Sequence, residues 1–313
     1  MRILAVDDDP SILELLDRVL DAFGYKDVVT ARSGPEAIEI LSRPNEAFDC
    51  LLLDVQMPQM NGITLCEEVR KLPEYTYTPI IMVTAMVQKE YIDEAFGVGA
   101  TDYVTKPFEF SDLKQRLSDA YRMAAERRAA IEVLEAEADF ELCFGNSPDV
   151  RLSDPQCFGD LPGFIGLAEF ENYVNQLSTM HSMAAKLVAV KCIGAEQLFE
   201  KSTVSEFRSA MTLAGTAVLS ASQEGRKVAT YWGNGVFLVI YDNQINLSVD
   251  QLGAPLPEAL KEISSDTTSG RPIGFQVSEE VMLKAKTKME ALFLIDKAVE
   301  MVEMSEGRAA NIG

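Results

Sequence analysis

Residues 2–9 read RILAVDDD, in which a run of apolar residues ends in three acids. Four more short apolar runs follow within the first 110 residues, and amphipathic stretches separate them. We expect strands at Ile3–Val6, Asp27–Ala31, Cys50–Leu53, Ile80–Val83 and Tyr103–Thr105. Strands that alternate with helices are typical of a parallel sheet with crossover connections. The first part of the chain is therefore predicted to be α/β, with a doubly wound, five-stranded parallel sheet.

The stretch between the first two runs has the pattern of an amphipathic helix. Its apolar stripe follows the helical spacing i, i+3, i+4, i+7, i+8 and i+11, with Ile12, Leu15, Leu16, Val19, Leu20 and Phe23. Ser11 is placed to cap the start of this helix, and Gly24 is placed to end it.

The composition limits the classes of function. The chain has 313 residues, with 28 Lys or Arg against 49 Asp or Glu, so its net charge at pH 7 is −21. That length allows two domains. The negative charge repels phosphate backbones and anionic lipids, so DNA and membrane surfaces are not expected as partners. The five cysteines are widely spaced and fit neither a disulfide framework nor a zinc site. No apolar run approaches 18 residues, and the acid at Asp7 comes too early for a signal peptide, so we expect a cytoplasmic protein.

Residues 111–140 contain no Pro or Gly and predict one long helix. Its apolar residues follow a heptad pattern at Leu113, Leu117, Ala120, Ala124, Ile131, Leu134 and Ala138. Such a seam favours a homodimer through the 112–138 helix. The alternative is a long helix that packs the same stripe on its own chain.

Turn-forming residues are dense from Gly145 to Gly163 and predict a hinge at about 141–160. Beyond it, the pattern indicates an α+β domain with a mainly antiparallel sheet over residues 161–313. The expected helices are Ala168–Leu187, Val204–Ser222 and Ala291–Met304. The expected strands are Val188–Ile193, Val228–Trp232, Val236–Tyr241 and Ile273–Val277, and Gly233-Asn234-Gly235 would form a hairpin turn between the second and third of these.

Polar residues follow the predicted strands of the first domain where each apolar run ends. In chain order they are Asp7-Asp8-Asp9, Asp54, Thr84 and Lys106. Because the carboxyl ends of parallel strands meet at one edge of a sheet, we expect these side chains to converge. Converging carboxylates repel one another, and Mg²⁺ with oxygen ligands offsets that repulsion. A carboxylate beside such a cation can attack a phosphoryl group, while an ammonium and a hydroxyl stabilise the phosphoryl oxygens.

These residues and their neighbours resemble the receiver domain of two-component response regulators. The resemblance covers about residues 1–122, with the last helix extended as a stalk to about residue 140. The motifs that carry it are Val6-Asp7-Asp8, Leu53-Asp54, Met57-Pro58-Gln59-Met60-Asn61-Gly62, Val83-Thr84-Ala85 and Tyr103-Val104-Thr105-Lys106-Pro107-Phe108.

The resemblance implies that Asp54 is the phosphoacceptor and that Mg²⁺ is the cofactor. The metal would be held by Asp8, Asp54 and the backbone carbonyl of Gln56, and by Asp7 through a water molecule. The phosphoryl group would come from a sensor histidine kinase or a phosphotransfer protein.

The resemblance also implies roles for residues on the last two strands. Thr84 and Lys106 would contact the phosphoryl group. Tyr103 would change rotamer together with Thr84, and Lys106-Pro107 would be a cis peptide.

The second domain resembles the GGDEF domain of diguanylate cyclases over about residues 161–313. The segments that carry this resemblance are Leu161-Pro162-Gly163-Phe164, Phe170, the Val188–Ile193 strand, residues 229–240, and Ile295-Asp296-Lys297-Ala298 with residues 307–311.

The catalytic motif of that family is degenerate in this chain. Its five positions read Gly233, Asn234, Gly235, Val236 and Phe237, so Gly235 and Val236 replace the two acids. The family's other metal-binding Asp falls at Lys191 or Cys192, and its product-inhibition motif falls at Glu224-Gly225-Arg226-Lys227 with the end charges reversed. We therefore expect no catalytic cyclase residues and no enzyme activity from this domain.

The expected function is that of a response regulator whose inactive GGDEF-like domain acts through a downstream protein partner. Two alternatives remain open. The C-terminal domain could sense GTP or cyclic di-GMP, or the protein could serve as a phosphate sink. Residual diguanylate cyclase activity is a third, less favoured reading.

Overall fold

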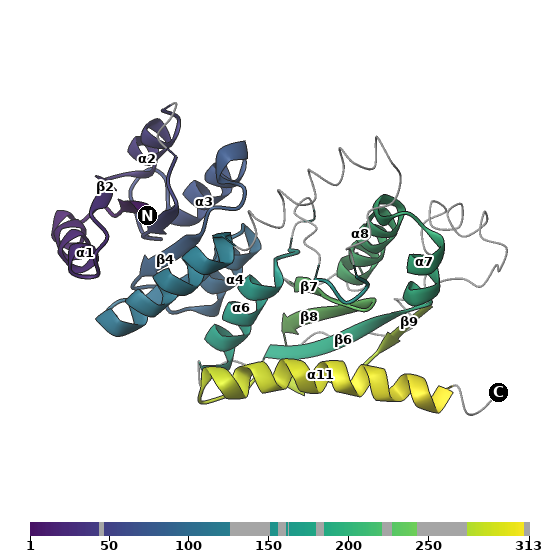
Figure 1. Ribbon diagram of the computed structural model, residues 1–313. Helices are drawn as coiled ribbons and strands as arrows, with labels where there is room; N and C mark the ends of the chain where they lie inside the picture. Colours follow the sequence, from purple (N-terminus) through teal and green to yellow (C-terminus); the bar gives the residue numbers. More distant parts are fainter. Residues whose placement is uncertain are drawn as a thin grey trace. The chain divides into compact units, whose positions relative to one another are not determined.

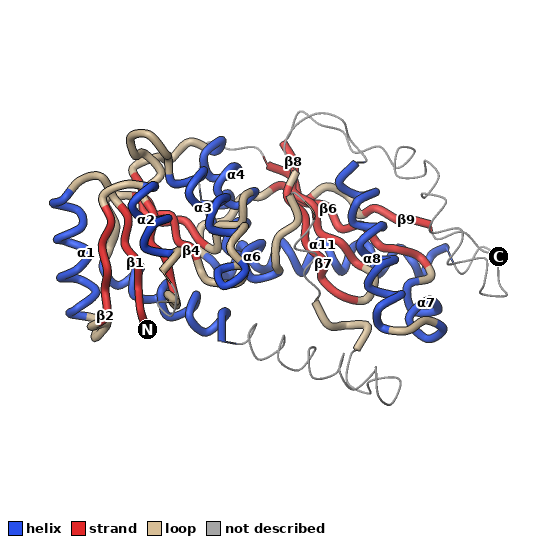
Figure 2. The backbone as a smooth tube through the Cα atoms, turned by 90° about the horizontal axis from the view of Figure 1, so that it is seen from above, coloured by secondary structure: helices blue, strands red, loops and turns tan. Residues whose placement is uncertain are grey.

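The structure, a computed structural model, describes residues 1–43, 47–125, 151–155, 161, 163–179, 185–220, 227–242 and 274–309 (Figures 1 and 2). The chain divides into two compact units, Met1–Asp139 and Phe140–Gly313. Three groups of predicted residues lie outside the described ranges: the seam residues Ile131, Leu134 and Ala138, most of the hinge at 141–160, and residues 224–226. None of the helices in the described ranges has the length and apolar character needed to cross a membrane.

The first unit is built on five parallel strands. They are β1 (Arg2–Val6), β2 (Asp27–Ala31), β3 (Cys50–Leu53), β4 (Ile80–Thr84) and β5 (Asp102–Thr105). Their order across the sheet is β2-β1-β3-β4-β5, and every pairing is parallel. The chain thus winds outward in both directions from the β1 and β3 pair, which confirms the predicted doubly wound sheet. The ends of β1 and β3 form the switch point at which such sheets bind their ligands.

The helices of this unit are α1 (Pro10–Ala22), α2 (Gly34–Leu41), α3 (Gly62–Arg70) and α4 (Lys89–Gly97), with a 3-10 turn η1 (Pro73–Tyr75) and a further helix described over 110–125. Helix α1 and the 110–125 helix share one buried core with the sheet. Helix α2 packs near β1 and β2, and α3 contacts both α2 and α4.

The start of α1 differs from the prediction. Asp9, not Ser11, is the N-cap, and its carboxylate accepts a hydrogen bond from the Ser11 backbone N–H at 2.8 Å. Pro10 takes the first helical position, where the N–H that proline lacks is not needed. The helix ends as predicted, because Gly24 adopts a φ of +96° directly after Phe23.

The heptad seam is used inside the first unit over its described part. Leu113, Leu117, Ala120 and Ala124 are buried, with exposed fractions from 0% to 4%. The first three belong to the same apolar core as Leu16 of α1. Up to residue 124 the stripe therefore packs on its own chain, which was the alternative to a dimer stalk.

The second unit is built on an antiparallel sheet. Its elements are α6 (Leu167–Thr179), β6 (Ala185–Ile193), α7 (Ala195–Lys201), α8 (Val204–Ser220), β7 (Val228–Gly233), β8 (Val236–Asp242), β9 (Gly274–Val277), β10 (Val281–Met282) and α11 (Lys288–Ala309). The strand order is β10-β6-β8-β7, and β9 also pairs with β6. This confirms an antiparallel sheet in a second domain.

One predicted boundary in this unit is wrong. A helix was expected over Ala168–Leu187, but β6 already begins at Ala185 and pairs with β8 from that residue onward. This boundary depends on the pairing of β6 with β8, which is distant in the sequence. The local pattern of apolar residues therefore could not predict it. The short elements α7 and β10 were not predicted.

Helices cover both faces of the second sheet (Figure 1). Alternate residues of β6, including Val190 and Cys192, enter a core with α7 and α8. On the other face, α11 packs along β6 and against α6.

Candidate functional site

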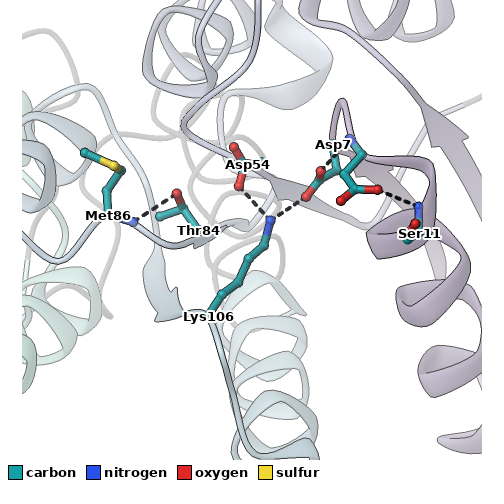
Figure 3. Close-up of polar contacts among 7 residues, drawn as sticks. Asp7, Ser11, Asp54, Thr84, Met86 and Lys106 are labelled. Carbon is teal, nitrogen blue, oxygen red and sulfur yellow. Dashed lines mark hydrogen bonds and ion pairs between the residues drawn. The ribbon is translucent and has the colours of Figure 1, made fainter.

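The polar residues that follow the strands of the first unit meet at one edge of its sheet (Figure 3). Asp7 follows β1, Asp54 follows β3, Thr84 ends β4 and Lys106 follows β5. The parallel arrangement brings these four positions together although up to 99 residues separate them in the chain. The predicted convergence is therefore observed for all four.

Lys106 reaches between two buried carboxylates. Its Nζ donates hydrogen bonds to Asp7 Oδ2 at 2.5 Å and to Asp54 Oδ1 at 2.7 Å. Asp7 and Asp54 are 3% and 6% exposed. Burial by itself would lower the pKa of Lys106, but its hydrogen bonds to the two carboxylates outweigh burial and raise the pKa. Lys106 is therefore firmly protonated at neutral pH.

The cluster of Asp7, Asp54 and Lys106, called the pocket below, carries more negative than positive charge. Burial raises the pKa of Asp54, and the nearby Asp7 carboxylate raises it further, against the lowering effect of Lys106. Two carboxylates share a single ammonium group, so one negative charge remains uncompensated. Additional positive charge would be stabilised here.

A tight loop holds Asp54 in position. The Asp54 backbone N–H donates to Val6 O at 2.9 Å, and the Gly62 N–H donates to Val55 O at 3.0 Å. A Cβ atom on Gly62 would collide with the carbonyl oxygen of Asp54. Asn61 caps α3 by accepting a hydrogen bond from the Thr64 N–H at 2.8 Å. Gly62 was part of a quoted motif, but its contact with the Asp54 backbone depends on the fold and was not predicted.

Thr84 and Tyr103 both bind the backbone of Met86. Thr84 Oγ1 accepts from the Met86 N–H at 3.3 Å, and the Tyr103 hydroxyl donates to Met86 O at 2.9 Å. Burial raises the pKa of Tyr103, so its hydroxyl stays protonated and can donate this bond. The sequence reasoning did not single out Met86, because a backbone contact leaves no residue-type signal. The Lys106-Pro107 peptide is cis, as predicted.

The predicted metal ligands are only partly assembled. Asp7 and Asp54 converge, but Asp8 is exposed. The Gln56 backbone donates a hydrogen bond to the Asp54 carboxylate. Within the part of the chain that the structure describes, no three His, Cys, Asp or Glu side chains form a metal-holding group. The Lys106 ammonium lies at the point where the two carboxylates meet. Two buried carboxylates with excess negative charge are nevertheless a donor set that suits Mg²⁺.

Residues 233–235, which the sequence analysis compared with the GGDEF motif, form the turn between β7 and β8. Gly233, Asn234 and Gly235 have φ angles of +117°, +52° and +75°. The Asn234 N–H donates to Leu152 O at 2.8 Å, and a Cβ atom on Gly233 would collide with the carbonyl oxygen of Ser153. The glycine at position 233 therefore lets residues 152 and 153 pack directly against the backbone of this turn.

The other side of the turn is also packed. The Gly235 carbonyl accepts from the Cys192 N–H at 2.8 Å, and a Cβ atom on Gly235 would lie 2.5 Å from Ala195 Cβ. Val236 and Phe237 are both fully buried. The structure places the motif residues together, but it offers no carboxylate among them.

The two candidates for the family's further metal ligand are buried. Lys191 is 6% exposed and Cys192 is 0% exposed. Burial raises the pKa of the Cys192 thiol to about 12, so it is a neutral thiol at physiological pH. A neutral buried thiol is a poor metal ligand.

Comparisons with known proteins identify the first unit. A sequence profile described as "Response regulator receiver domain" matches residues 3–118. The chain is 37% identical over 119 residues to a chemotaxis protein CheY homolog of Campylobacter jejuni, across 38% of this chain and 91% of that protein. The chain therefore belongs to the response regulators, and its N-terminal part is a receiver domain.

The chain is also similar to a transcriptional regulator and to a protein of solved structure. The alkaline phosphatase synthesis transcriptional regulatory protein PhoP of Bacillus subtilis is 34% identical over 147 residues, across 46% of this chain and 58% of that protein. The solved structure of Vibrio cholerae chemotaxis protein CheY4 is 36% identical, with 38% of this chain and 97% of that chain covered and a TM-score of 0.36. Receiver domains are phosphorylated on an aspartate, generally bind Mg²⁺ there, and interact with histidine kinases or phosphotransfer proteins.

Proposed function

We propose that Asp54 is the phosphoacceptor of this receiver domain. The observation that carries this assignment is the buried Asp54 carboxylate at the β3 end, hydrogen-bonded to Lys106 beside Asp7. Asp7 is an alternative carboxylate, and like Asp54 it accepts hydrogen bonds from Lys106 and from a backbone N–H, so the choice between the two rests on position. Asp54 lies at the centre of the strand-end residues, between the Lys106 ammonium and Thr84 (Figure 3).

The reaction follows from this geometry. A carboxylate oxygen of Asp54 bonds to phosphorus while the bond from phosphorus to the donor atom breaks, and the donor leaves with the electron pair. Lys106 stays within reach of the new phosphoryl oxygens and offsets their charge. Thr84 would donate its hydroxyl hydrogen to a phosphoryl oxygen, because its oxygen only accepts in the hydrogen bond with the Met86 N–H.

Mg²⁺ is the proposed cofactor. Asp8, Asp54 and the Gln56 carbonyl would supply its ligands, and Asp7 would act through a water molecule. When bound, the cation neutralises charge on the phosphoryl oxygens. The excess negative charge of the pocket supports this proposal, because it leaves room for a further cation.

The test of the acceptor is labelling with acetyl phosphate in Mg²⁺. The Asp54→Asn variant should incorporate no phosphate, because an amide is not a nucleophile. Asp17→Asn changes an exposed acid of α1 and serves as the matched control, which should label as the wild type does. Wild-type labelling of Asp54→Asn would contradict the assignment.

We propose further that the second unit is a degenerate GGDEF-like domain that makes no cyclic di-GMP and acts by binding a downstream protein. Two observations support this. Positions 235 and 236 carry no acid, and residues 152 and 153 cover the turn that would have to receive a nucleotide. Incubation with GTP and Mg²⁺ should therefore give no product by chromatography, and calorimetry should show no heat with GTP or cyclic di-GMP. Product or heat would favour a cyclase or a nucleotide sensor instead.

The partner-binding output has its own test. Beryllofluoride-activated and untreated protein should capture different partners from a native lysate. Identical capture in both states would move the proposal toward a phosphate sink.

A further inference from the structure

Helix α11 carries an apolar ridge that its own unit does not cover. Met289, Phe293 and Met304 are 82%, 65% and 72% exposed. Every other exposed large apolar side chain in the described ranges is at most 51% exposed. Single exposed apolar residues are ordinary, but the three most exposed ones in the described ranges lie on a single helix. Met289 and Phe293 are about one turn apart, and Met304 lies about 16 Å farther along, with the exposed Glu300 between them on the same face.

The ridge lies opposite the face that α11 packs into the unit. Ala291, Ile295, Ala298 and Val302 are buried, and α11 contacts β6 and α6. At 100° per residue, Met289, Phe293 and Met304 fall within about 60° of one another, on the far side of the helix from those four. Figure 1 shows α11 along the outside of the second unit's sheet.

The charges along α11 point to the occupant of this ridge. Around the start of α11 the exposed Lys284, Lys286 and Lys288 outnumber the exposed Glu290 of its first turn. Farther along the helix the exposed Asp296, Glu300 and Glu303 outnumber the exposed Lys297. The exposed side chains of residues 284–290 therefore carry net positive charge, and those of residues 296–303 carry net negative charge. A second α11 that runs antiparallel would bring the basic start of each copy onto the acidic half of the other.

We propose that the outer face of α11 is a self-association surface, on which two copies of this chain pair their α11 helices antiparallel about a two-fold axis. Such an interface is self-complementary, so one apolar ridge and two oppositely charged ends suffice. Phe293 lies near its centre and Met289 flanks it. The surface consists of residues of the second unit and includes none of residues 112–138.

Sedimentation of the full chain tests the surface itself. The wild type should dimerise, and Phe293→Asp should weaken dimerisation about tenfold or more, as loss of a central aromatic anchor does. Because Phe293 is mostly exposed, circular dichroism should show an unchanged fold. Ile193→Ser removes an exposed apolar residue elsewhere in the unit and should leave the dimer intact.

Charge exchange tests the orientation. Lys286→Glu with Lys288→Glu should weaken the dimer, and adding Glu300→Lys with Glu303→Lys to the same chain should restore it. A monomeric wild type would overturn the proposal. A dimer that resists Phe293→Asp but is lost in Leu134→Asp would overturn it too and would place the interface on the 112–138 helix.

Discussion

The sequence suggests chemistry at two places: the strand-end pocket of the receiver domain and the β7–β8 turn of the second unit. The two differ in what surrounds the residues concerned. In the pocket, two buried carboxylates meet one ammonium group, and the charge is incompletely balanced. At the turn, backbone from residues 152 and 153 and a buried Val236 occupy the space. Unbalanced charge leaves a site that can stabilise a ligand of opposite charge, whereas the packed turn holds segments of its own unit together.

The largest expected effect comes from restoring an acid at the turn. Val236→Glu places a carboxylate at a fully buried position, so we expect the free energy of unfolding to fall by about 4 kcal/mol. Urea denaturation measures this, and the variant should still make no cyclic di-GMP. Asn234→Asp, at a turn position with φ of +52°, is the control and should be nearly neutral. A stable, active Val236→Glu variant would break the contrast between the two regions.

Removing the ammonium from the pocket should have the next largest effect. Lys106→Met leaves two buried carboxylates unpaired, so we expect a loss of about 3 kcal/mol of stability at pH 7 without Mg²⁺. Lys106 lowers the pKa of Asp54, so its loss raises that pKa further. A carboxyl group whose pKa is raised on folding destabilises the folded state above that pKa. The deficit should therefore shrink as pH falls through the carboxyl range. A deficit that does not change between pH 7 and pH 4 would contradict this account.

Gly62→Ala tests the loop that positions Asp54. The new methyl group would collide with the Asp54 carbonyl, so we expect a loss of about 2 kcal/mol together with slower labelling by acetyl phosphate. Gly97→Ala is the matched control, because a Cβ on this residue of α4 meets no atom within 4 Å. The control should be neutral or slightly stabilised. Normal labelling of Gly62→Ala would show that the loop does not set the acceptor's position.

The smallest effect is expected from Tyr103→Phe. This change removes the 2.9 Å hydrogen bond to Met86 O and should cost about 1 kcal/mol in thermal or urea unfolding. Because Thr84 binds the same residue, Tyr103→Phe and Thr84→Ala should give less than additive losses in a double-mutant cycle. Fully additive losses would mean that the two side chains do not act together through Met86.

Much of the first unit could be read from the sequence. Five apolar runs predicted five strands, and the polar residues after them predicted Asp7, Asp54, Thr84 and Lys106 as one cluster. This works because the order of parallel strand ends follows from the order of elements along the chain. Asp8 could not be separated from Asp7 in this way, since adjacent residues carry the same pattern and only the fold exposes one of them.

The second unit was harder to read for a physical reason. The helix expected to run through Leu187 gives way to β6 by Ala185, because β6 gains its hydrogen bonds from β8, about 50 residues away.

In the first unit, the heptad seam at Leu113 and Leu117 was compatible with a dimer stalk or with packing inside one chain. Over the described part, the seam packs against α1 of the same chain.

The pattern of residue types was thus sufficient for the five strands of the first unit and for the convergence of Asp7, Asp54, Thr84 and Lys106, since both follow from the order of elements along the chain. Folding alone determined that Gly62 supports the Asp54 backbone, that residues 152 and 153 close the β7–β8 turn, and that α11 leaves a ridge exposed. These features arise where segments far apart in the chain come into contact, and no local pattern encodes such contacts.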